Sequence, residues 1–454
     1  MLNPQATMHA AAVSRPAVRL FRSTGAPFGI PRSVSWRRPQ RCIAALAELE
    51  ILKHAQRFVP NRGDLEPPPI PDLLNYRLHA PGLLSGCEAE SAPLRVAVLL
   101  SGGVDSSLAL HLLSAAGHHV TAFYLQVWFQ EDFRNTWDAC PWEEDLRYCR
   151  AVCERLGVGL QQVTLTEQYW DRVVAHCIAE IQQGRTPNPD VLCNSRVKFG
   201  AFLEHLEARH GDAFDRIASG HYACLTRSTS AAAGIQLPQP QVQLRMTPDA
   251  VKDQTYFLAH LTQHQLARSL FPLGHLTKPE IGLPNQARKD SQGICFLGKV
   301  KFSEFVREHL GDWPGPLVNE DSNEVVGYHH GYWFHTVGQR KGIPLPGGPW
   351  YVTCKHPQTN TVYVSRQYHR HDKLRNSFSC SLFSWCSAVR PDASRPLYCK
   401  VRHGPHMYRC RLTFHNSGKA ADVVLDGSDQ GLAAGQYAVF YQDDVCLGSA
   451  SITD

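Results

Sequence analysis

A glycine-rich turn between an apolar strand and a helix constrains this 454-residue chain more than any other stretch. Residues 95–100 (RVAVLL) have the length and apolar character of a buried strand, and residues 108–117 (LALHLLSAAG) have the composition of a helix that ends at glycine. Adjacent glycines in the intervening S-G-G-V-D-S-S let the backbone approach an anion closely, and the N–H groups at a helix start carry partial positive charge. The sequence therefore predicts a strand-turn-helix unit that binds phosphate groups.

The polar side chains of this turn favour the same interpretation. Ser101, Ser106 and Ser107 supply hydroxyl donors, and Asp105 is a carboxylate suited to a phosphate-bound Mg²⁺. The turn matches neither G-x-x-x-x-G-K-[ST] nor G-x-G-x-x-G. It resembles the PP-loop of ATP pyrophosphatases, which cleave ATP to AMP and pyrophosphate while they adenylate a substrate. A serine- and glycine-rich turn without a ligand is the alternative, and the aspartate inside the turn favours the phosphate site.

The first 47 residues differ in composition from the rest of the chain. They contain no Asp, Glu or Lys, but they contain seven arginines separated by Ser, Ala and Pro. This composition is typical of an organellar transit peptide, and the stretch has no apolar h-region of a secretory signal. A disordered basic arm that binds nucleic acid is the alternative. We expect a transit peptide over 1–47 and a location in a plastid or a mitochondrion, with the plastid slightly favoured. The arginines are Arg15, Arg19, Arg22, Arg32, Arg37, Arg38 and Arg41.

The net charge does not argue for a nucleic-acid partner. The formal charge of +5 falls to −2 when the seven arginines of the leader are subtracted. A local basic stretch exists over 366–411, where ten Lys or Arg stand against two Asp. It is either a surface for nucleic acid or an ordinary solvated face. No apolar run reaches about 18 residues, so we expect no membrane span.

The fifteen cysteines fall into two groups. Their number is odd, no C-x-x-C pair occurs, and no secretory signal is present, which argues against a structural disulfide framework. Cys149, Cys153 and Cys177 lie on apolar stripes with helical spacing and are predicted core thiols. Cys193, in R-T-P-N-P-D-V-L-C-N, and Cys295, in K-D-S-Q-G-I-C-F-L-G, lie instead where proline or glycine predicts a loop.

These two loop cysteines are candidate nucleophiles. Pro187 and Pro189 disfavour helix, so we expect a rigid exposed loop before Cys193. Cys295 lies between two glycines and close to charged residues. A thiolate is the reactive form, and mobile loops near cationic groups favour it. Ordinary partly buried thiols are the alternative for each cysteine taken alone.

The order of apolar patterns predicts three domains. Strands at 95–100, 119–125, 159–165 and 215–219 alternate with helices at 107–116, 144–156, 169–183 and 198–209, which favours a doubly wound parallel sheet. After about residue 300 the helices become scarce and short apolar runs predict a β-rich fold, followed by the alternation of a β-barrel or sandwich. The expected divisions are an extension over 48–93, a nucleotide-binding domain over 94–298 with a flexible insertion at 229–240, a central domain over 299–372 and a barrel over 373–454.

Motifs spread along the chain resemble those of one enzyme family. They include S-G-G-V-D-S-S, C-P-W-E-E-D-L, G-R-T-P-N-P-D-V-L-C-N, S-G-H-Y-A, V-K-D-Q-T-Y-F-L, K-D-S-Q-G-I-C-F-L-G, T-V-G-Q-R-K-G-I, G-G-P-W-Y-V and D-Q-G-L-A-A-G-Q. Together and in this order, from about residue 95 to 450, they resemble the tRNA-specific 2-thiouridylases (MnmA type) of bacteria and organelles. The residues of these motifs are most similar to those of plant and algal organellar members.

The resemblance implies a fold, an activity and partners. The fold is α/β: a Rossmann-like PP-loop ATP pyrophosphatase domain with a parallel sheet, then a small β-rich central domain and a C-terminal β-barrel. The activity is adenylation of the 2-oxo group of the wobble uridine in tRNA, then persulfide sulfur transfer that yields 2-thiouridine, AMP and pyrophosphate. The implied cofactors are ATP and Mg²⁺. The partners are tRNAs of the Lys, Glu and Gln acceptors and a persulfide donor, either a cysteine desulfurase or a sulfur relay.

The resemblance also assigns site residues. Cys295 receives sulfur as a persulfide, Cys193 is its partner in a transient Cys193–Cys295 disulfide, and Asp190 is a proton-transfer group. Asp105 is the residue suited to magnesium on ATP. The implied ATP contacts are Leu99, Leu100, Ser101, Gly102, Gly103, Val104, Asp105, Ser106, Leu125 and Gly220. The implied tRNA contacts are Asn188, Pro189 and Asp190 at the target base, and His221, Lys252, Asp253, Gln254, Arg402, His403 and Gln436 elsewhere.

One departure from the family pattern keeps other functions open. Between Glu280 and Gly282 the family carries roughly another helix, whereas here only Ile281 intervenes. A tRNA-binding protein that lost its chemistry with this segment is one alternative. A PP-loop amidotransferase or ligase is another, although no glutaminase module is visible and the two thiol segments would have no task there.

Overall fold

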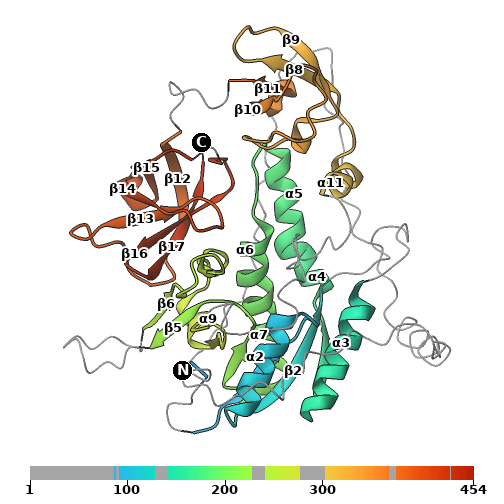
Figure 1. Cartoon of the computed structure of the whole chain (residues 1–454), viewed down its shortest axis with the longest axis vertical. Helices are drawn as coiled ribbons and strands as arrows, with labels where there is room; N and C mark the ends of the chain where they lie inside the picture. The colour runs from blue at the N-terminus through green and yellow to red at the C-terminus, as the bar shows by residue number, and fades with distance from the viewer. Residues whose placement is uncertain are drawn as a thin grey trace, which may run out of the picture. The chain divides into compact units, whose positions relative to one another are not determined.

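The computed structural model describes residues 86–87, 92–127, 141–227, 241–276, 302–367, 375–429 and 431–453 (Figure 1). Their strands form three sheets. The predicted leader, the insertion at 229–240, the shortened segment at Ile281 and the Cys295 motif lie outside the described residues. None of the described helices is long and apolar enough to cross a membrane.

The first sheet is parallel throughout and has the strand order β3-β2-β1-β4-β7. The central strand β1 is buried from Val96 to Leu99, as expected for a parallel sheet covered on both faces. Figure 1 shows α2 and α3 beside β2. The strands are β1 (Arg95–Leu99), β2 (His119–Gln126), β3 (Leu160–Thr164), β4 (Arg216–Ala218) and β7 (Ser269–Leu270). The predicted parallel sheet is thus observed, with β7 as a short strand that the apolar pattern did not predict.

The helices around this sheet follow the predicted order as far as α7, with one difference at its start, and the short helices α8 and α9 were not predicted. A helical run was predicted to begin at residue 198, after a proline loop. Instead α6, η3 and α7 follow one another from Pro189 to His210, and η3 is a π-helical segment. The helical elements of the first domain are α2 (Val104–Ala115), α3 (Pro141–Leu156), α4 (Thr166–Tyr169), η2 (Trp170–Val174), α5 (Ala175–Gln182), α6 (Pro189–Cys193), η3 (Asn194–Ala201), α7 (Phe202–His210), η4 (Gly211–Ala213), α8 (Thr255–Leu258) and α9 (Gln263–Ala267).

The central domain is a four-stranded sheet of order β10-β11-β8-β9, preceded by the helix α11 (Phe302–Leu310). Its small core contains Leu317, Val352, Val362 and Val364 together with Tyr332. This agrees with the predicted β-rich fold. The elements are β8 (Gly315–Asn319), β9 (Val325–His329), η5 (Tyr332–Phe334), β10 (Tyr351–His356), η6 (Pro357–Thr359) and β11 (Thr361–Ser365).

The third sheet closes on itself through the pairing of β12 with β17, which makes the predicted barrel. Its edge also carries a hairpin from the nucleotide-binding segment, because β6 pairs with the beginning of β17. The elements are β12 (Ser377–Ser384), β13 (Leu397–Lys400), β14 (Tyr408–His415), η7 (Asn416–Gly418), β15 (Ala420–Leu425), β16 (Tyr437–Gln442) and β17 (Val445–Ile452), with the hairpin strands β5 (Cys224–Arg227) and β6 (Val242–Arg245).

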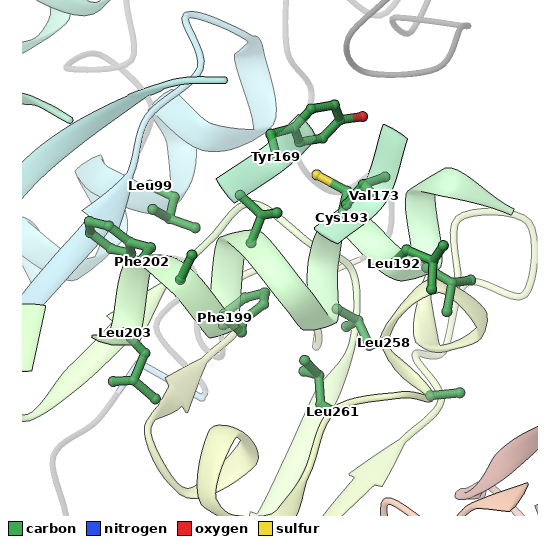
Figure 2. Close-up of a cluster of buried hydrophobic side chains, with 14 of the residues drawn as sticks. Leu99, Tyr169, Val173, Leu192, Cys193, Phe199, Phe202, Leu203, Leu258 and Leu261 are labelled. Atoms are coloured by element: carbon green, nitrogen blue, oxygen red, sulfur yellow. The ribbon is translucent and has the colours of Figure 1, made fainter. Parts of the chain in front are cut away.

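One hydrophobic cluster joins these parts. It contains residues of the parallel sheet such as Leu99, the helical run around Cys193, and barrel residues such as Tyr437 and Val439. Figure 2 shows part of this cluster, with Cys193, Leu192 and Phe199 on the helical run among the side chains of neighbouring elements. The helices that carry the predicted site therefore pack between the sheet and the barrel.

Candidate active site

The predicted phosphate turn lies where β1 ends and α2 begins. Gly102 adopts φ +74°, and a Cβ added there would lie 2.7 Å from the backbone oxygen of Asp145 on α3. Gly103 is the N-cap of α2, and no side chain in the described residues caps that helix. No described side chain occupies the N-cap position of α2, which is compatible with the anion site that the sequence predicts.

The serines of the turn bond to the turn itself. Ser106 Oγ lies 3.2 Å from both the amide and the hydroxyl of Ser101 and donates to the carbonyl oxygen of Gly103 at 3.0 Å. Ser107 Oγ donates to the same carbonyl at 2.9 Å. These bonds shape the turn, so the serine hydroxyls define its geometry as well as providing polar groups near a ligand.

The apolar residues assigned to ATP contribute differently. The side chains of Leu99 and Leu100 are buried, and Val104 and Leu125 pack against hydrophobic clusters. The side chains of Leu99 and Leu100 are therefore part of the core, whereas those of Val104 and Leu125 are half-buried.

Gly220 brings the loop after β4 against this turn. A Cβ added at Gly220 would lie 2.7 Å from both the backbone carbon of Asp105 and the backbone nitrogen of Ser106. Any larger residue would displace the start of α2. Gly220 was assigned to ATP by resemblance, and the structure places it in backbone contact with the phosphate turn.

Asp105 has a partner that the sequence did not single out. The hydroxyl of Tyr222 donates to Asp105 Oδ1 at 3.0 Å, and Tyr222 is 1% exposed. A single carboxylate beside a phosphate turn suits Mg²⁺, because that ion takes most of its ligands from phosphate oxygens and water. Among the described residues no group of three His, Cys, Asp or Glu could hold a metal alone.

The segment that carries Cys193 is a capped helix and not the predicted loop. Asn188 is the N-cap of α6, and its side-chain oxygen accepts from the amide of Val191 at 3.4 Å. Pro189 is in the first turn, where its missing N–H would have had no helical partner. The prediction that the prolines prevent a helix here is therefore wrong.

Cys193 itself is buried. Its side chain is 2% exposed and belongs to the hydrophobic cluster of Figure 2. The expected exposed thiol is thus wrong for this structure, because the helix turns Cys193 inward. Asp190, in the first turn of α6, is half-buried. Cys295 lies outside the described residues, and the Cys193–Cys295 disulfide stays a prediction.

The barrel holds the segment that precedes this helix. The amide of Thr186 donates to the oxygen of Ala434 at 2.7 Å. Gln436 donates to the oxygen of Thr186 at 3.0 Å and accepts from the side chain of Asn188 at 3.3 Å. Gly435 adopts φ +91°, and a Cβ there would lie 2.9 Å from the nitrogen of Thr186. Gln436, assigned to tRNA by resemblance, is therefore used in anchoring this segment.

The central domain contacts the same segment from its other end. The hydroxyl of Tyr332 donates to the backbone oxygen of Gln182, and a Cβ at Gly184 would lie 2.4 Å from the ring of Pro357. Arg185 forms two bonds of 2.5 Å with Glu180, and this bonded guanidinium lowers the pKa of the Glu180 carboxyl. All three domains thus meet at residues 182–190.

Asp253, which the resemblance assigned to tRNA, has a buried side chain. It is 1% exposed, and its Oδ1 lies 3.4 Å from the Nζ of the equally buried Lys400. It also accepts from the Thr255 hydroxyl at 2.6 Å and from the Thr247 amide at 3.1 Å. The assignment of the Asp253 side chain to tRNA is therefore corrected: it pairs the nucleotide-binding segment with the barrel.

The other residues assigned to tRNA near Asp253 are at least partly accessible to solvent. Lys252 and Gln254 are half-buried. Arg402 is exposed and is held by a 3.1 Å bond to the buried Asp429. His403 is also exposed, and its ring stacks on Phe257. Each of these four side chains therefore has solvent-exposed surface that a large ligand can contact.

The basic stretch at 366–411 is only partly a surface. Lys400 is buried against Asp253, so it cannot contact a partner. Arg366 stacks over the ring of Trp350, 5.4 Å from its centroid. Arg390, Arg395, Arg409 and Arg411 are exposed. The exposed arginines of this stretch therefore lie on β14 and on the turns before it, and Arg395 among them is paired with Asp443.

His221 lies between the phosphate turn and the Cys193 helix. Its Nδ1 is 2.8 Å from the Ser219 hydroxyl, and its ring centroid is 6.2 Å from that of Phe199 in η3. Burial, with the charge of Lys198 as a second cause, lowers the pKa of His221 to about 3. It is therefore neutral near pH 7 and contributes no charge to this part of the site.

The three predicted core thiols are confirmed. Cys149, Cys153 and Cys177 are buried, and burial raises their pKa to about 12, 11 and 12. Thiols with such pKa values are poor nucleophiles.

Three residues that hold the site together were not predicted from the sequence: Tyr222, Lys400 and Gly435. Tyr222 and Gly435 do lie in the motifs S-G-H-Y-A and D-Q-G-L-A-A-G-Q, so a signal was present. Lys400 lies in no such motif and was counted with the basic stretch at 366–411, because lysines are usually exposed.

Three family models match consecutive parts of the chain. The tRNA methyl transferase HUP domain matches residues 94–299, the tRNA methyl transferase PRC-barrel domain matches 303–366, and the aminomethyltransferase beta-barrel domain matches 375–452. The order agrees with the parallel sheet, the central sheet and the closed barrel described above.

Curated relatives match nearly their whole length. The tRNA-specific 2-thiouridylase MnmA of Parabacteroides distasonis is 39% identical over 80% of this chain and 99% of its own. MnmA of Porphyromonas gingivalis is 38% identical over 79% of this chain and 99% of its own, and MnmA 2 of Bacteroides fragilis is 40% identical over the same shares. With this identity over the HUP, PRC-barrel and beta-barrel parts together, the chain belongs to the MnmA family of tRNA-specific 2-thiouridylases.

Proposed function

We propose that this protein is an ATP-dependent tRNA-uridine 2-sulfurtransferase that makes 2-thiouridine at the wobble position. One observation carries the proposal: a short segment connects the phosphate turn to the helix of Cys193. Gly220 packs against the backbone of Asp105 and Ser106, and the next residue, His221, packs against Phe199. An activating site and a thiol are therefore built on adjoining elements of one domain.

The phosphate turn would serve the first step. The 2-oxygen of uracil is amide-like and is a poor leaving group. When it attacks the α-phosphorus of ATP, pyrophosphate leaves and the oxygen becomes part of a bound AMP. The uncapped start of α2 would hold the phosphates, and Asp105 would hold a magnesium ion that neutralises their charge.

The cysteines would serve the second step. The terminal sulfur of a Cys295 persulfide attacks carbon 2, and AMP leaves with the former oxygen. The Cys193 thiolate then attacks the Cys295 sulfur, which releases 2-thiouridine and leaves a Cys193–Cys295 disulfide. A thiol reductant must supply two electrons before the next cycle. Asp190, three residues before Cys193 in the same helix, would exchange the proton.

The target base must leave its stack to reach this site. Asn188, Pro189 and Asp190 would face it, since they form the start of α6. Lys252, Gln254, Arg402 and His403 would contact the rest of the tRNA. The substrates proposed are tRNAs of the Lys, Glu and Gln acceptors, and the sulfur source is a cysteine desulfurase or a sulfur relay.

The arginine-rich leader supports an organellar location for this chemistry. We propose that residues 1–47 are a transit peptide and that the mature protein acts in a plastid or a mitochondrion. The domain divisions at about 94, 299 and 373 are proposed with it. Nucleoside mass spectrometry of plastid and mitochondrial tRNA, after loss of the protein, would locate the missing 2-thiouridine.

Purified protein, a wobble-uridine tRNA, ATP, Mg²⁺ and a persulfide donor provide the direct test. We expect tRNA-dependent release of pyrophosphate together with 2-thiouridine in digested tRNA. A protein that only binds tRNA would release no pyrophosphate. A ligase or amidotransferase would release pyrophosphate without forming 2-thiouridine, and either result would contradict the proposal.

A further inference from the structure

We propose that Tyr222 is a positioning residue for the nucleotide site. Its hydroxyl orients the carboxylate of Asp105, and hydrogen bonds between the backbone of Tyr222 and Gln254 hold the tyrosine in place. This inference rests on the proposed function, since it concerns the carboxylate that would face magnesium and ATP. Tyr222 itself would touch neither the nucleotide nor the reacting atoms.

The contact between the two side chains is direct. The Tyr222 hydroxyl donates to Asp105 Oδ1 at 3.0 Å. Tyr222 is 1% exposed, so its hydroxyl cannot exchange this bond for one to bulk water. A hydrogen bond to a carboxylate is stronger than one between neutral groups and restricts the torsion of the carboxylate. The direction of the Asp105 oxygens therefore depends on where the tyrosine ring lies.

The tyrosine ring is itself held in place. The amide of Tyr222 donates to Gln254 Oε1 at 3.0 Å, and the amide of Gln254 donates back to the oxygen of Tyr222 at 2.9 Å. The Nζ of Lys252 lies 5.5 Å from the centre of the Tyr222 ring, within the range of a cation–π contact. These three contacts come from one short segment and leave the ring little freedom.

The backbone beside the tyrosine leaves no room for adjustment. Gly220, two residues earlier, is so close to Asp105 and Ser106 that a single added carbon would overlap their backbone. A movement of residues 220–222 is therefore transmitted to the phosphate turn. The tyrosine sets the carboxylate direction while the glycine sets the position of the helix start.

This arrangement links the nucleotide turn to the barrel. Gln254 follows Asp253, which is paired with Lys400, and Thr255 lies 3.2 Å from the hydroxyl of Tyr441. The segment that fixes Tyr222 is thus itself fixed by β13 and β16. The orientation of Asp105 depends on contacts far from the turn in sequence.

The test is the variant Tyr222→Phe, which keeps the ring and removes only the hydroxyl. Isothermal titration with α,β-methylene-ATP, over a range of Mg²⁺ concentrations, measures nucleotide affinity without turnover. We expect the Mg²⁺ concentration for half-maximal binding to rise about ten-fold, since a hydrogen bond to a charged group is lost. Binding in EDTA should stay unchanged. In the thiolation assay the KM for ATP should rise while the KM for tRNA does not.

Two further variants make the result specific. Tyr328→Phe removes a hydroxyl from an exposed ring of the central sheet and should behave like the wild type. In an Asp105→Asn background, Tyr222→Phe should have no additional effect on the Mg²⁺ requirement. A full additional effect would mean that Tyr222 does not act through Asp105 and would overturn the inference.

The remaining outcomes are also decisive. An unchanged Mg²⁺ requirement in Tyr222→Phe, or an equal loss of affinity with and without Mg²⁺, would overturn the inference, because a merely structural tyrosine would not distinguish the two conditions. A wild-type protein that binds nucleotide but makes no 2-thiouridine would count against the proposed function instead. The two failures are therefore separable.

Discussion

Thr186 donates its backbone N–H to the carbonyl oxygen of Ala434 at 2.7 Å, so the residues before the Cys193 helix are bonded to a different domain. Gln436 adds a second bond to the same residue, and Tyr332 of the central domain binds Gln182 just upstream. The geometry of α6 therefore depends on the barrel and the central sheet as well as on its own sequence. Changes far from the thiol are expected to alter its chemistry.

Cys193→Ser should reduce 2-thiouridine formation by about 10³-fold or more, because the hydroxyl cannot resolve a disulfide-linked intermediate. Affinity for tRNA should change little, since Cys193 is buried and does not contribute surface. Nucleoside mass spectrometry and a filter-binding assay measure the two quantities. The matched control is Cys177→Ala, which removes another buried thiol of the same hydrophobic cluster. Full thiolation by Cys193→Ser would rule out the two-cysteine mechanism.

Gly435→Ala should lower both stability and thiolation. The alanine must adopt φ +91°, which costs about 1–2 kcal/mol, and its Cβ would press on the backbone of Thr186. Urea unfolding measures the first effect and the thiolation rate measures the second. Gly159→Ala is the control, because nothing lies within 4 Å of a Cβ at Gly159. If the two variants had equal stability and equal thiolation rates, the close approach of Gly435 to Thr186 would contribute to neither.

Lys400→Met should lower the free energy of unfolding by about 3 kcal/mol or more, because it leaves the carboxylate of Asp253 buried without its cation. Urea denaturation of the full chain measures this loss. Arg307→Met provides the comparison, since its ion pair with Asp312 is solvent-exposed and is worth about 0.5 kcal/mol. A loss for Lys400→Met no larger than that for Arg307→Met would contradict a buried interdomain ion pair.

His111→Leu should make the protein more stable and less sensitive to acid. Neither ring nitrogen of His111 has a hydrogen-bond partner in the described part of the chain, and burial, with Arg155 as a second cause, lowers the pKa of His111. The unfolded histidine gains a proton below about pH 6.5 and the folded one only at a lower pH, so stability falls as the pH drops below 6.5.

Urea unfolding at pH 7.5 and pH 5 tests this. The leucine variant should gain about 1 kcal/mol at pH 7.5 and more at pH 5, since it removes one proton-linked transition of up to about 1.4 kcal/mol per pH unit. An unaltered difference between the two pH values would show that His111 does not contribute to the acid response.

The fold was predictable where the pattern is local. The strand, glycine turn and helix from Arg95 to Ala115 depend on neighbouring residues, and the prediction agrees with the structure to within a few residues. At Pro189 the prediction was wrong. Proline opposes the interior of a helix but suits its first turn, and Asn188 supplied the cap that identifies that position.

The site was less predictable because its contacts are distant in sequence. Asp253 and Lys400 are 147 residues apart, and Tyr222 reaches Asp105 across 117 residues. A charged residue inside a motif indicates importance without indicating whether it faces a partner or the interior. For Asp253 the burial of its partner decides the question, and no pattern within its own segment reports that burial.

The hairpin of β5 and β6 has a consequence for the way this chain is synthesised. Arg245, on β6, pairs with Asp444 beside β17, and 199 residues separate them. During translation the hairpin is made well before β17, so the edge of β6 has unpaired backbone until β17 follows. The barrel edge is therefore completed only once β17 has been made, and a chain that stops before β17 would leave unpaired strand backbone on the hairpin of the nucleotide-binding domain.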